Sequence, residues 1–363
     1  MKTTILNVTF LVFGASLFAQ TTWTVDNRPG TTAQFTSVQA AIDAAAEGDF
    51  IYVHPSAILY NNITINKEIH LRGIGHSPEL ANGENAKINA IMLSTDNISK
   101  SASSSSIMGL EIVNGINDNN FGPISNVLIQ NNRMGFIALS RPFNFIIQGN
   151  VFSSSQPNFI RFFTNVSHAN NIISHNIFIR NANSQIVATI EGLVSSETFS
   201  NNIVVFNNTS NDLGMFENCL NPIVNNNMFL LNSSQTTATE IKLLNSTVNF
   251  QNCLTFAYGG QTLNTLNGTN NLDNTNPLFV NIGNTANMAF TQNNNYKLDV
   301  GSPAINAGSD GDDLGFYGQG FLFQMKGYPF DLPYPTSINI NNAIVEAGGN
   351  LEVVFKASAN VEN

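Results

Sequence analysis

The stretch VLIQNNRM at residues 127–134 combines apolar residues with a pair of asparagines, and its pattern returns five times further along the chain. The later copies are FIIQGNVF (145–152), NIISHNIF (171–178), TFSNNIVV (198–205), PIVNNNMF (222–229) and VNFQNCLT (248–255). The aligned asparagines are Asn132, Asn150, Asn176, Asn202, Asn227 and Asn252, and successive subtraction gives spacings of 18, 26, 26, 25 and 25 residues. These spacings are too regular for chance and too long for a hairpin meander, which turns every ~8–12 residues. We therefore expect each repeat to form one multi-strand coil of a solenoid.

Asparagine replaces much of the charge that an ordinary soluble domain carries. The 363 residues include 58 asparagines, and only 10% of the chain is charged, against about 25% in typical globular domains. Hydrophobic residues make up 42% of the chain, which is enough for a large core and excludes general disorder. An asparagine at a corner tolerates the left-handed backbone conformation, and its amide can donate and accept along a stack of identical side chains about 4.8 Å apart. We expect the aligned asparagines to form such a ladder.

A helix is predicted ahead of the first strands. Residues 35–46 (FTSVQAAIDAAA) place apolar side chains on one face, with Thr36 as N-cap, Gln39 at the capping-box position and Gly48 as the stop. The strands expected next lie at residues 51–53, 63–65 and 69–71. The helix is expected to cover the first coil and to shield a sheet edge that would otherwise pair with other chains.

The segments on either side of the repeats carry a family resemblance. On the N-terminal side the sequence reads SVQAAIDAAAEGDFIYVHP (37–55) and then NNITINKEIHLRGIG (61–75). On the C-terminal side it reads NPLFV (276–280), YKL (296–298) and GSPAINAGSDGDDLGFYGQG (301–320). These runs and the asparagine ladder resemble the pectin-lyase-like superfamily of right-handed parallel β-helix proteins, in its secreted bacterial form. Asn306 departs from the usual Asp of the closing motif, and Gln319 from the usual Gly.

The resemblance covers about residues 22–325 and implies an all-β chain, a right-handed parallel β-helix solenoid with an N-terminal capping helix. It implies little about chemistry, because the superfamily contains lyases, hydrolases, esterases, epimerases, adhesins and proteins without known activity.

Three regions are predicted along the chain. Residues 1–20 have the pattern of a secretory signal peptide, with Lys2 before a mostly apolar stretch and small Ala19 at the cleavage site. Residues 21–325 are the predicted β-helix with its N-terminal cap, in roughly ten coils. Residues 326–363 are predicted to be a linker and a short C-terminal β tail, which either packs on the last coil or begins a further module. The signal predicts a secreted or cell-surface protein with no transmembrane segment after its removal.

Charge and cysteine content narrow the possible partners. Fourteen Lys and Arg against 24 Asp and Glu give a net charge of −10, so no basic surface is available for nucleic acid. Cys219 and Cys253 are too few for a disulfide framework and are expected to be free thiols. No regular threonine face is present, which argues against an ice-binding sheet.

Catalytic residues are not evident from the sequence. Hydrolysis of a glycosidic bond requires two carboxylates about 5–9.5 Å apart, and no local pair occurs among the acids between residues 124 and 271. These acids are Glu191, Glu197, Asp212, Glu217 and Glu240. Elimination of a uronate requires a base and a cation that neutralises the substrate carboxylate. The candidate bases are Arg133, Arg141, Arg161, His168, His175, Arg180 and Lys242, without an acidic cluster nearby that would hold Ca²⁺.

The one concentrated acidic group is Asp310, Asp312 and Asp313 in SDGDDLG. Acids alternating with glycine can surround a hard cation such as Ca²⁺, or they can cap backbone amides in a turn. These three are the candidate metal ligands; no other cofactor is predicted, and catalytic and ligand-binding residues stay unassigned. The predicted function is that of a secreted or cell-surface β-helix protein without an evident catalytic site, either carbohydrate-recognising or structural, with extracellular polysaccharide or cell-surface components as partners. The alternative is a carbohydrate-active enzyme, a polysaccharide (uronate) lyase.

Overall fold

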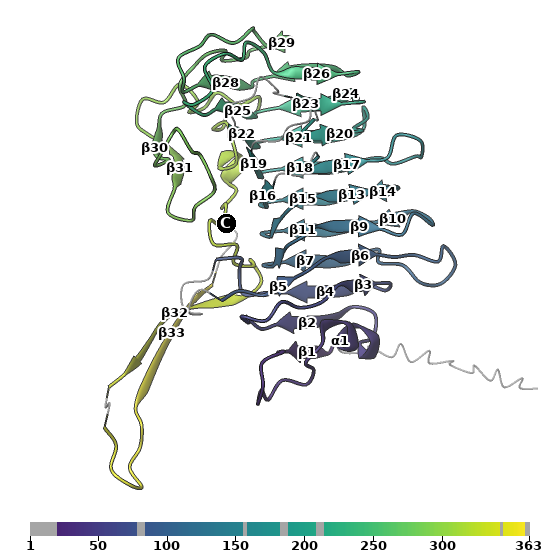
Figure 1. The fold of residues 1–363 in the computed structure, drawn as a ribbon, viewed down its shortest axis with the longest axis vertical. Helices are drawn as coiled ribbons and strands as arrows, with labels where there is room; N and C mark the ends of the chain where they lie inside the picture. Colours follow the sequence, from purple (N-terminus) through teal and green to yellow (C-terminus); the bar gives the residue numbers. More distant parts are fainter. Residues whose placement is uncertain are drawn as a thin grey trace, which may run out of the picture.

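The computed structural model describes residues 20–77, 84–154, 158–181, 188–207, 214–341 and 344–359. The predicted signal peptide (residues 1–20) and Asp212 therefore lie outside the described residues, except for Gln20. Within these ranges the chain is almost entirely β-structure, wound into a tall solenoid (Figure 1).

Three long sheets run the length of the solenoid, and every strand pairing inside them is parallel. Sheet A contains β1 (Thr22–Val25), β2 (Asp49–Val53), β4 (Ile69–Arg72), β7 (Ser106–Met108), β11 (Leu128–Gln130), β15 (Ile146–Gln148), β18 (Ile172–Ser174), β21 (Thr198–Ser200), β24 (Leu220–Asn225), β27 (Thr247–Gln251) and β29 (Gly268–Thr269). Sheet B contains β5 (Lys87–Ile88), β8 (Glu111–Ile112), β12 (Arg133–Met134), β16 (Val151–Ser154), β19 (Ile177–Asn181), β22 (Ile203–Asn207), β25 (Met228–Leu231) and β28 (Leu254–Ala257). Sheet C contains β3 (Ile63–Ile65), β6 (Ile91–Leu93), β9 (Ile116–Asp118), β13 (Ile137–Leu139), β17 (Ile160–Phe162), β20 (Ile190–Glu191), β23 (Gly214–Glu217) and β26 (Lys242–Leu244).

The chain visits sheets A, B and C in turn, so the predicted all-β parallel β-helix is confirmed. Sheets B and C have eight strands each among the described residues, which corresponds to about eight coils where roughly ten were expected. A further pair, β10 (Ile124–Ser125) and β14 (Pro142–Phe143), joins two corners.

The solenoid core is built from apolar side chains that repeat at the same position of successive coils. Ile129, Ile147, Ile173 and Phe199 are aligned in sheet A and fully buried, and inward-facing phenylalanine rings contact one another across coils, as Phe152 and Phe178 of sheet B do, with centroids 4.7 Å apart. Burial of these rows removes apolar surface from water and holds neighbouring coils in register.

Sheet B is buried on both faces, because residues 277–325 cover its outer side. Ile179, Val205 and Leu230 point outward from this sheet, yet they form a second core with Met288, Tyr296, Ala304, Leu314, Phe316 and Phe323. The continuous apolar runs in the repeats, such as IVVF at 203–206, carry this information, since a strand covered on both faces does not alternate.

Buried asparagine side chains connect the coils at the corner between sheets A and B. The backbone N–H of each donates to the Oδ1 of the next at 2.9–3.0 Å, and each Nδ2 contacts the same oxygen at 3.0–3.2 Å. The series is Asn132, Asn150, Asn176, Asn202 and Asn227. The left-handed backbone conformation belongs to the preceding residues, Asn131, Gly149, His175, Asn201 and Asn226, so one asparagine does not perform both of the expected tasks.

The assignment of Asn252 to this series is wrong. Asn225 pairs with Gln251 and Met228 with Leu254, which aligns Asn227 with Cys253. Asn252 holds the left-handed corner (φ 51°) and donates from Nδ2 to Ala307 O at 2.8 Å. A buried free cysteine therefore interrupts the asparagine series, and the Asn227 Nδ2 to Cys253 Sγ distance is 3.9 Å.

Replacing Cys253 by asparagine is expected to raise the free energy of unfolding by about 1 kcal/mol, because a full amide would replace a weak sulfur acceptor. Urea denaturation followed by circular dichroism measures the change. Cys253→Ala is the matched control and is expected to lower stability, since it removes the acceptor and supplies nothing in its place. A Cys253→Asn protein no more stable than Cys253→Ala would contradict this account of the stack.

Helix α1 (Val38–Ala44) follows β1 and contacts β1, β2 and β3. Its N-cap is Ser37, whose side chain accepts from Ala40 N, so the expected Thr36 cap is wrong by one residue. Gln39 instead binds the backbone of Thr64, accepting from its N–H at 2.7 Å. The shielding role of this helix stays a prediction.

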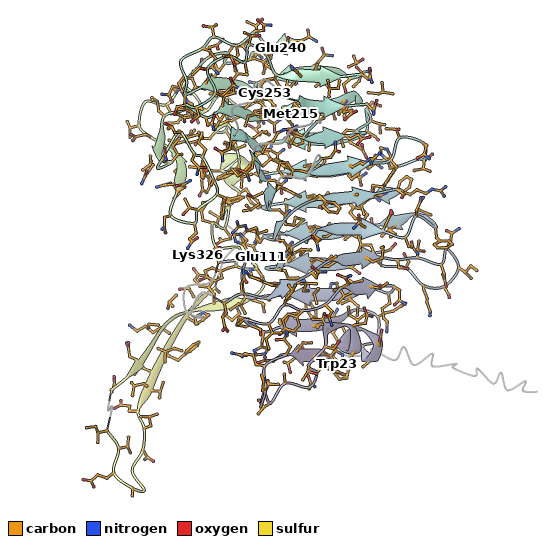
Figure 2. The ribbon with its side chains drawn as sticks, viewed as in Figure 1. Trp23, Glu111, Met215, Glu240, Cys253 and Lys326 are labelled. Atoms are coloured by element: carbon orange, nitrogen blue, oxygen red, sulfur yellow. The ribbon has the colours of Figure 1, made fainter. Side chains whose placement is uncertain are left out.

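The predicted closing coil is a return segment. Residues 305–331, here called the strap, run back along the corner between sheets A and B toward the N-terminal coils. The contacts in chain order are Ala307 O with Asn252 Nδ2 (2.8 Å), Ser309 N with Asn226 Oδ1 (2.8 Å), the Phe321 ring with the His175 ring (4.4 Å), Tyr328 O with Asn131 Nδ2 (2.9 Å), and Asp331 Oδ2 with Arg72 Nη2 (2.7 Å). Figure 2 shows Lys326 of the strap at the level of Glu111, far along the solenoid from Glu240.

The strap delivers the C-terminal tail to the opposite end of the molecule from the one expected. Strands β32 (Pro333–Ile340) and β33 (Val353–Ala359) form an antiparallel hairpin. The hairpin projects from the solenoid near β4 and β5 (Figure 1), so the prediction that the tail packs on the last coil is wrong. An antiparallel pair, β30 (Phe279–Asn281) and β31 (Asn295–Leu298), lies in the segment that covers sheet B.

Candidate functional site

A charged row lies on the outer face of sheet C. Arg161 of β17 pairs in register with Glu191 of β20, and Glu191 pairs with Glu217 of β23. Register partners in adjacent parallel strands lie about 4.8 Å apart at the backbone, so three consecutive coils present a guanidinium and two carboxylates side by side. We call Arg161, Glu191 and Glu217 the charged row.

The surroundings of the charged row differ from residue to residue. Arg161 Nε lies 3.0 Å from Glu191 Oε2; the Arg161 side chain is 45% exposed, whereas that of Glu191 is only 12% exposed. The guanidinium also lies over the Phe163 ring, 4.8 Å from its centroid. Burial raises the pKa of Glu191, the neighbouring Glu217 raises it further, and Arg161 and Asn218 act in the opposite direction. The row therefore holds one carboxyl that resists ionisation more than usual.

The raised pKa of Glu191 has a consequence for stability. A carboxyl whose pKa is higher in the folded than in the unfolded protein favours folding while it is protonated, so that contribution is lost as pH rises through the folded pKa. We expect Glu191→Gln to gain stability relative to the natural protein as the pH rises from about 4 to about 7. Urea denaturation of both proteins at several pH values measures this, and a difference that shrinks with rising pH would contradict it.

The sequence analysis missed the pairing of the two carboxylates. Glu191 lies 15 residues after Asn176, and Glu217 lies 15 residues after Asn202, so both carry the same offset from the repeat. The expectation that the acids fall at different coil positions holds for Glu240 but is wrong for this pair. The equal offsets are the signal that finds it.

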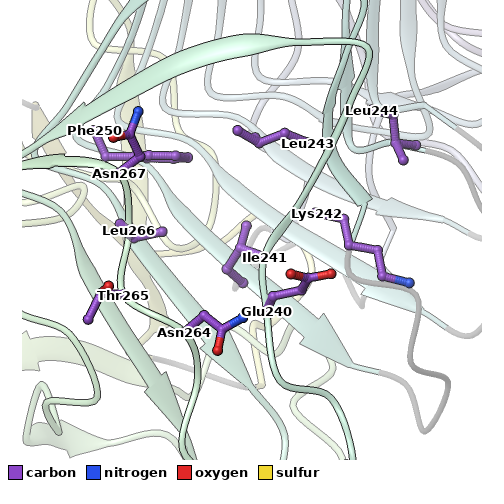
Figure 3. Close-up of a pocket in the computed structure, with 10 residues that line it drawn as sticks. All are labelled: Glu240, Ile241, Lys242, Leu243, Leu244, Phe250, Asn264, Thr265, Leu266 and Asn267. Carbon is purple, nitrogen blue, oxygen red and sulfur yellow. The ribbon is translucent and has the colours of Figure 1, made fainter.

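The charged row leads into a pocket at the far end of sheet C. Leu244 of β26 is the register partner of Glu217 and lines a cavity of about 490 Å³. The other lining residues are Glu240, Ile241, Lys242, Leu243, Phe250, Asn264, Thr265, Leu266 and Asn267. Figure 3 shows Glu240 and Asn264 on one side of this pocket, with Phe250 and Leu266 on the opposite side. The cavity combines an apolar wall with carboxylate, amine and amide groups, a composition typical of small-molecule sites.

The candidate bases do not converge on one site. His175 is covered by Phe321 of the strap, and burial lowers its pKa to about 4. Arg180 is buried, with Nη1 donating to Gly214 O at 3.0 Å. His168 is buried against Glu197, with Nδ1 2.9 Å from Oε1. Of the bases that the lyase hypothesis singled out, only Arg161 reaches the outer face of sheet C.

The remaining candidate bases also lie apart. Arg133 of sheet B has its guanidinium 5.9 Å from the centroid of Phe290, Arg141 precedes β14 at a corner, and Lys242 lines the pocket described above.

The candidate metal ligands are distributed within their turn. Asp310 accepts from Gln319 Nε2 at 2.6 Å and from Asp312 N at 3.1 Å, while Asp313 accepts from Asn306 N at 3.0 Å. In the part of the chain that the structure describes, no group of three or more His, Cys, Asp or Glu side chains is placed to hold a metal ion. These contacts match the alternative in which the acids cap backbone amides, and metal binding here stays a prediction.

Comparison with known proteins adds little beyond the fold. No protein-family model matches the sequence, and no curated protein matches it. Among solved structures, the crystal structure of pectate lyase Pel9A matches with a TM-score of 0.39 and 12% sequence identity, over 83% of this chain and 97% of that chain. Because identity and superposition are both this low, the site has to be judged on its own geometry.

Proposed function

We propose that this protein is an extracellular β-helix that binds a neutral polysaccharide on the outer face of sheet C. The observation that supports this most is the register of Arg161, Glu191 and Glu217, which lines up acceptors and donors on an open face that continues into the pocket. Carboxylates accept hydrogen bonds from sugar hydroxyls and a guanidinium donates them. Coils stacked at a constant spacing suit an extended chain of repeating units better than a compact ligand.

A neutral glycan fits the charges better than a uronate does. The charged row has two carboxylates and one guanidinium, and that guanidinium is already paired with Glu191. The chain as a whole carries a net charge of −10, so a polyanion would be repelled over distances of about a Debye length. The uronate-lyase alternative is weakened by this charge and by the separation of its bases.

A second candidate function is hydrolysis of the bound glycan by Glu191 and Glu217. Glycosidases use two neighbouring carboxyl groups whose environments separate their pKa values, so that one donates a proton while the other stays ionised. The raised pKa of Glu191 beside Glu217 is the observation that favours this role.

The extracellular location rests on the signal pattern at residues 1–20. Among the described residues, no helix is both long and apolar enough to cross a membrane.

A panel of soluble neutral and uronate-containing polysaccharides tests the proposal, in native affinity electrophoresis with and without Ca²⁺. We expect retardation by at least one neutral polymer, independent of Ca²⁺. Retardation only by uronates would overturn the ligand class, and no retardation by any polymer would overturn the proposal. Reducing-end release on the same panel tests hydrolysis, and absorbance near 235 nm tests elimination.

A further inference from the structure

The C-terminal hairpin carries an uncovered apolar face. Ile338 is opposite Phe355, and Ile340 is opposite Val353, so these four side chains lie on one side of the two-stranded sheet. All four are about half exposed or more. The other side of the hairpin carries Ser337, Asn339 and Lys356 together with Val354. A lone two-stranded hairpin is marginally stable in water, and a one-sided apolar face of this kind indicates a missing layer.

A second uncovered apolar surface lies on the outer face of sheet A. Ile146, Ile172, Thr198 and Ile223 are register partners in four consecutive strands, and Ile223 is 50% exposed. Beside this row on the same face runs a polar row, made of Gln148, Ser174, Ser200 and Asn225. An apolar centre with a polar, uncharged border is typical of protein interfaces.

The hairpin is placed so that it does not reach this row in its own chain. The strap fixes its base at β4, where Asp331 pairs with the buried Arg72. From there the hairpin points away from the solenoid (Figure 1), whereas the apolar row lies on β15, β18, β21 and β24, several coils further along. A partner for either surface must therefore come from another molecule.

We propose that the hairpin of one copy packs its apolar face on the apolar row of sheet A of a second copy. Both surfaces are flat sheet faces, both are aliphatic, and neither contains a charged side chain. Because the two surfaces differ, the contact is head-to-tail and leaves one hairpin and one sheet A free at the ends of each assembly. This inference does not depend on glycan binding, since the charged row lies on sheet C.

Association through four side chains is expected to be weak. The contact area falls short of the roughly 800 Å² per partner of a stable interface, so we expect a dissociation constant on the order of 10–100 μM. Because each copy carries a net charge of −10, added salt should strengthen association by screening the repulsion.

Sedimentation velocity on the chain without its signal region tests the proposal, over protein concentrations from about 5 to about 300 μM. Phe355→Asp places a charge on the hairpin face, and Ile172→Asp places one on the sheet A row; each variant alone is expected to remain monomeric. An equimolar mixture of the two should form dimers, because one intact hairpin and one intact row remain, and should form nothing larger. Ile98→Asp, at a loop position that is 92% exposed, is the matched control and should associate like the natural protein.

Each other outcome overturns the proposal. A natural protein that stays monomeric at the highest concentration shows that the two faces do not bind each other. If Phe355→Asp abolishes association while Ile172→Asp leaves it intact, the hairpins bind each other instead. If the mixture of variants stays monomeric although both are folded by circular dichroism, the two surfaces are not partners.

Discussion

Replacing Asn176 by alanine is expected to lower the free energy of unfolding by about 4 kcal/mol. Asn176 is fully buried, and its Oδ1 accepts from the backbone and side chain of Asn150 while its Nδ2 donates to Ile147 O, Ser174 O and Asn202 Oδ1. Alanine would leave several of these groups buried without a partner in the middle of the solenoid. Urea denaturation at neutral pH, followed by circular dichroism near 215 nm, measures the change.

Asn249→Ala is the matched control for this experiment. Asn249 lies on the exposed outer face of β27, where its Oδ1 accepts from Asn267 Nδ2 at 2.8 Å. Water can replace that contact, so we expect a loss below about 1 kcal/mol. Equal losses for the two variants would mean that the buried amides are no more important than exposed ones, contrary to the account of the corner given above.

The second large effect concerns the charged row. Changing both Glu191 and Glu217 to glutamine is expected to weaken binding of the neutral polysaccharide at least tenfold, about 1.4 kcal/mol, because amides replace charge-assisted acceptors. Glutamine preserves the shape of both side chains, so the fold should be retained. Isothermal titration calorimetry with an oligosaccharide of the best-binding polymer measures the affinity.

Glu47→Gln serves as the control in the calorimetry, since this exposed glutamate lies beside α1, far from sheet C. Its affinity should equal that of the natural protein. An unchanged affinity in the double variant would place the glycan elsewhere on the molecule.

The parallel β-helix could be predicted because its determinants are local and periodic. Recurring apolar residues stack on their own equivalents in the next coil, and asparagine marks the corners. The error at Asn252 arises because the asparagines come in adjacent pairs, such as Asn131 and Asn132. Periodicity alone does not distinguish the left-handed corner residue from the buried stacked one.

The strap could not be predicted in the same way. Its contacts join residues as far apart as Arg72 and Asp331, and no repeat relates the two segments. The closing motif at residues 301–320 resembles a final coil, yet in the structure it ends in a segment that returns along the solenoid. The apolar runs of sheet B do indicate a cover on its outer face, but they do not identify the covering segment.

The candidate site was only partly within reach of the sequence. The equal offsets of Glu191 and Glu217 place them in register, and the offset of Arg161 is hidden by a different loop length, 11 residues after Asn150 instead of 15. The raised pKa of Glu191 depends on burial and on both neighbours, which follow from the packing of three coils. A residue-by-residue search for local acid pairs cannot find such a site.

The central claim is that a glycan binds across the coils of sheet C. A crystal structure of the protein soaked with the best-binding neutral oligosaccharide tests it most directly. The account predicts sugar units along the outer faces of β17, β20 and β23, with hydroxyl groups within hydrogen-bond distance of Glu191 and Glu217. Sugar bound on sheet A or along the strap, with the charged row of sheet C unoccupied, would contradict it.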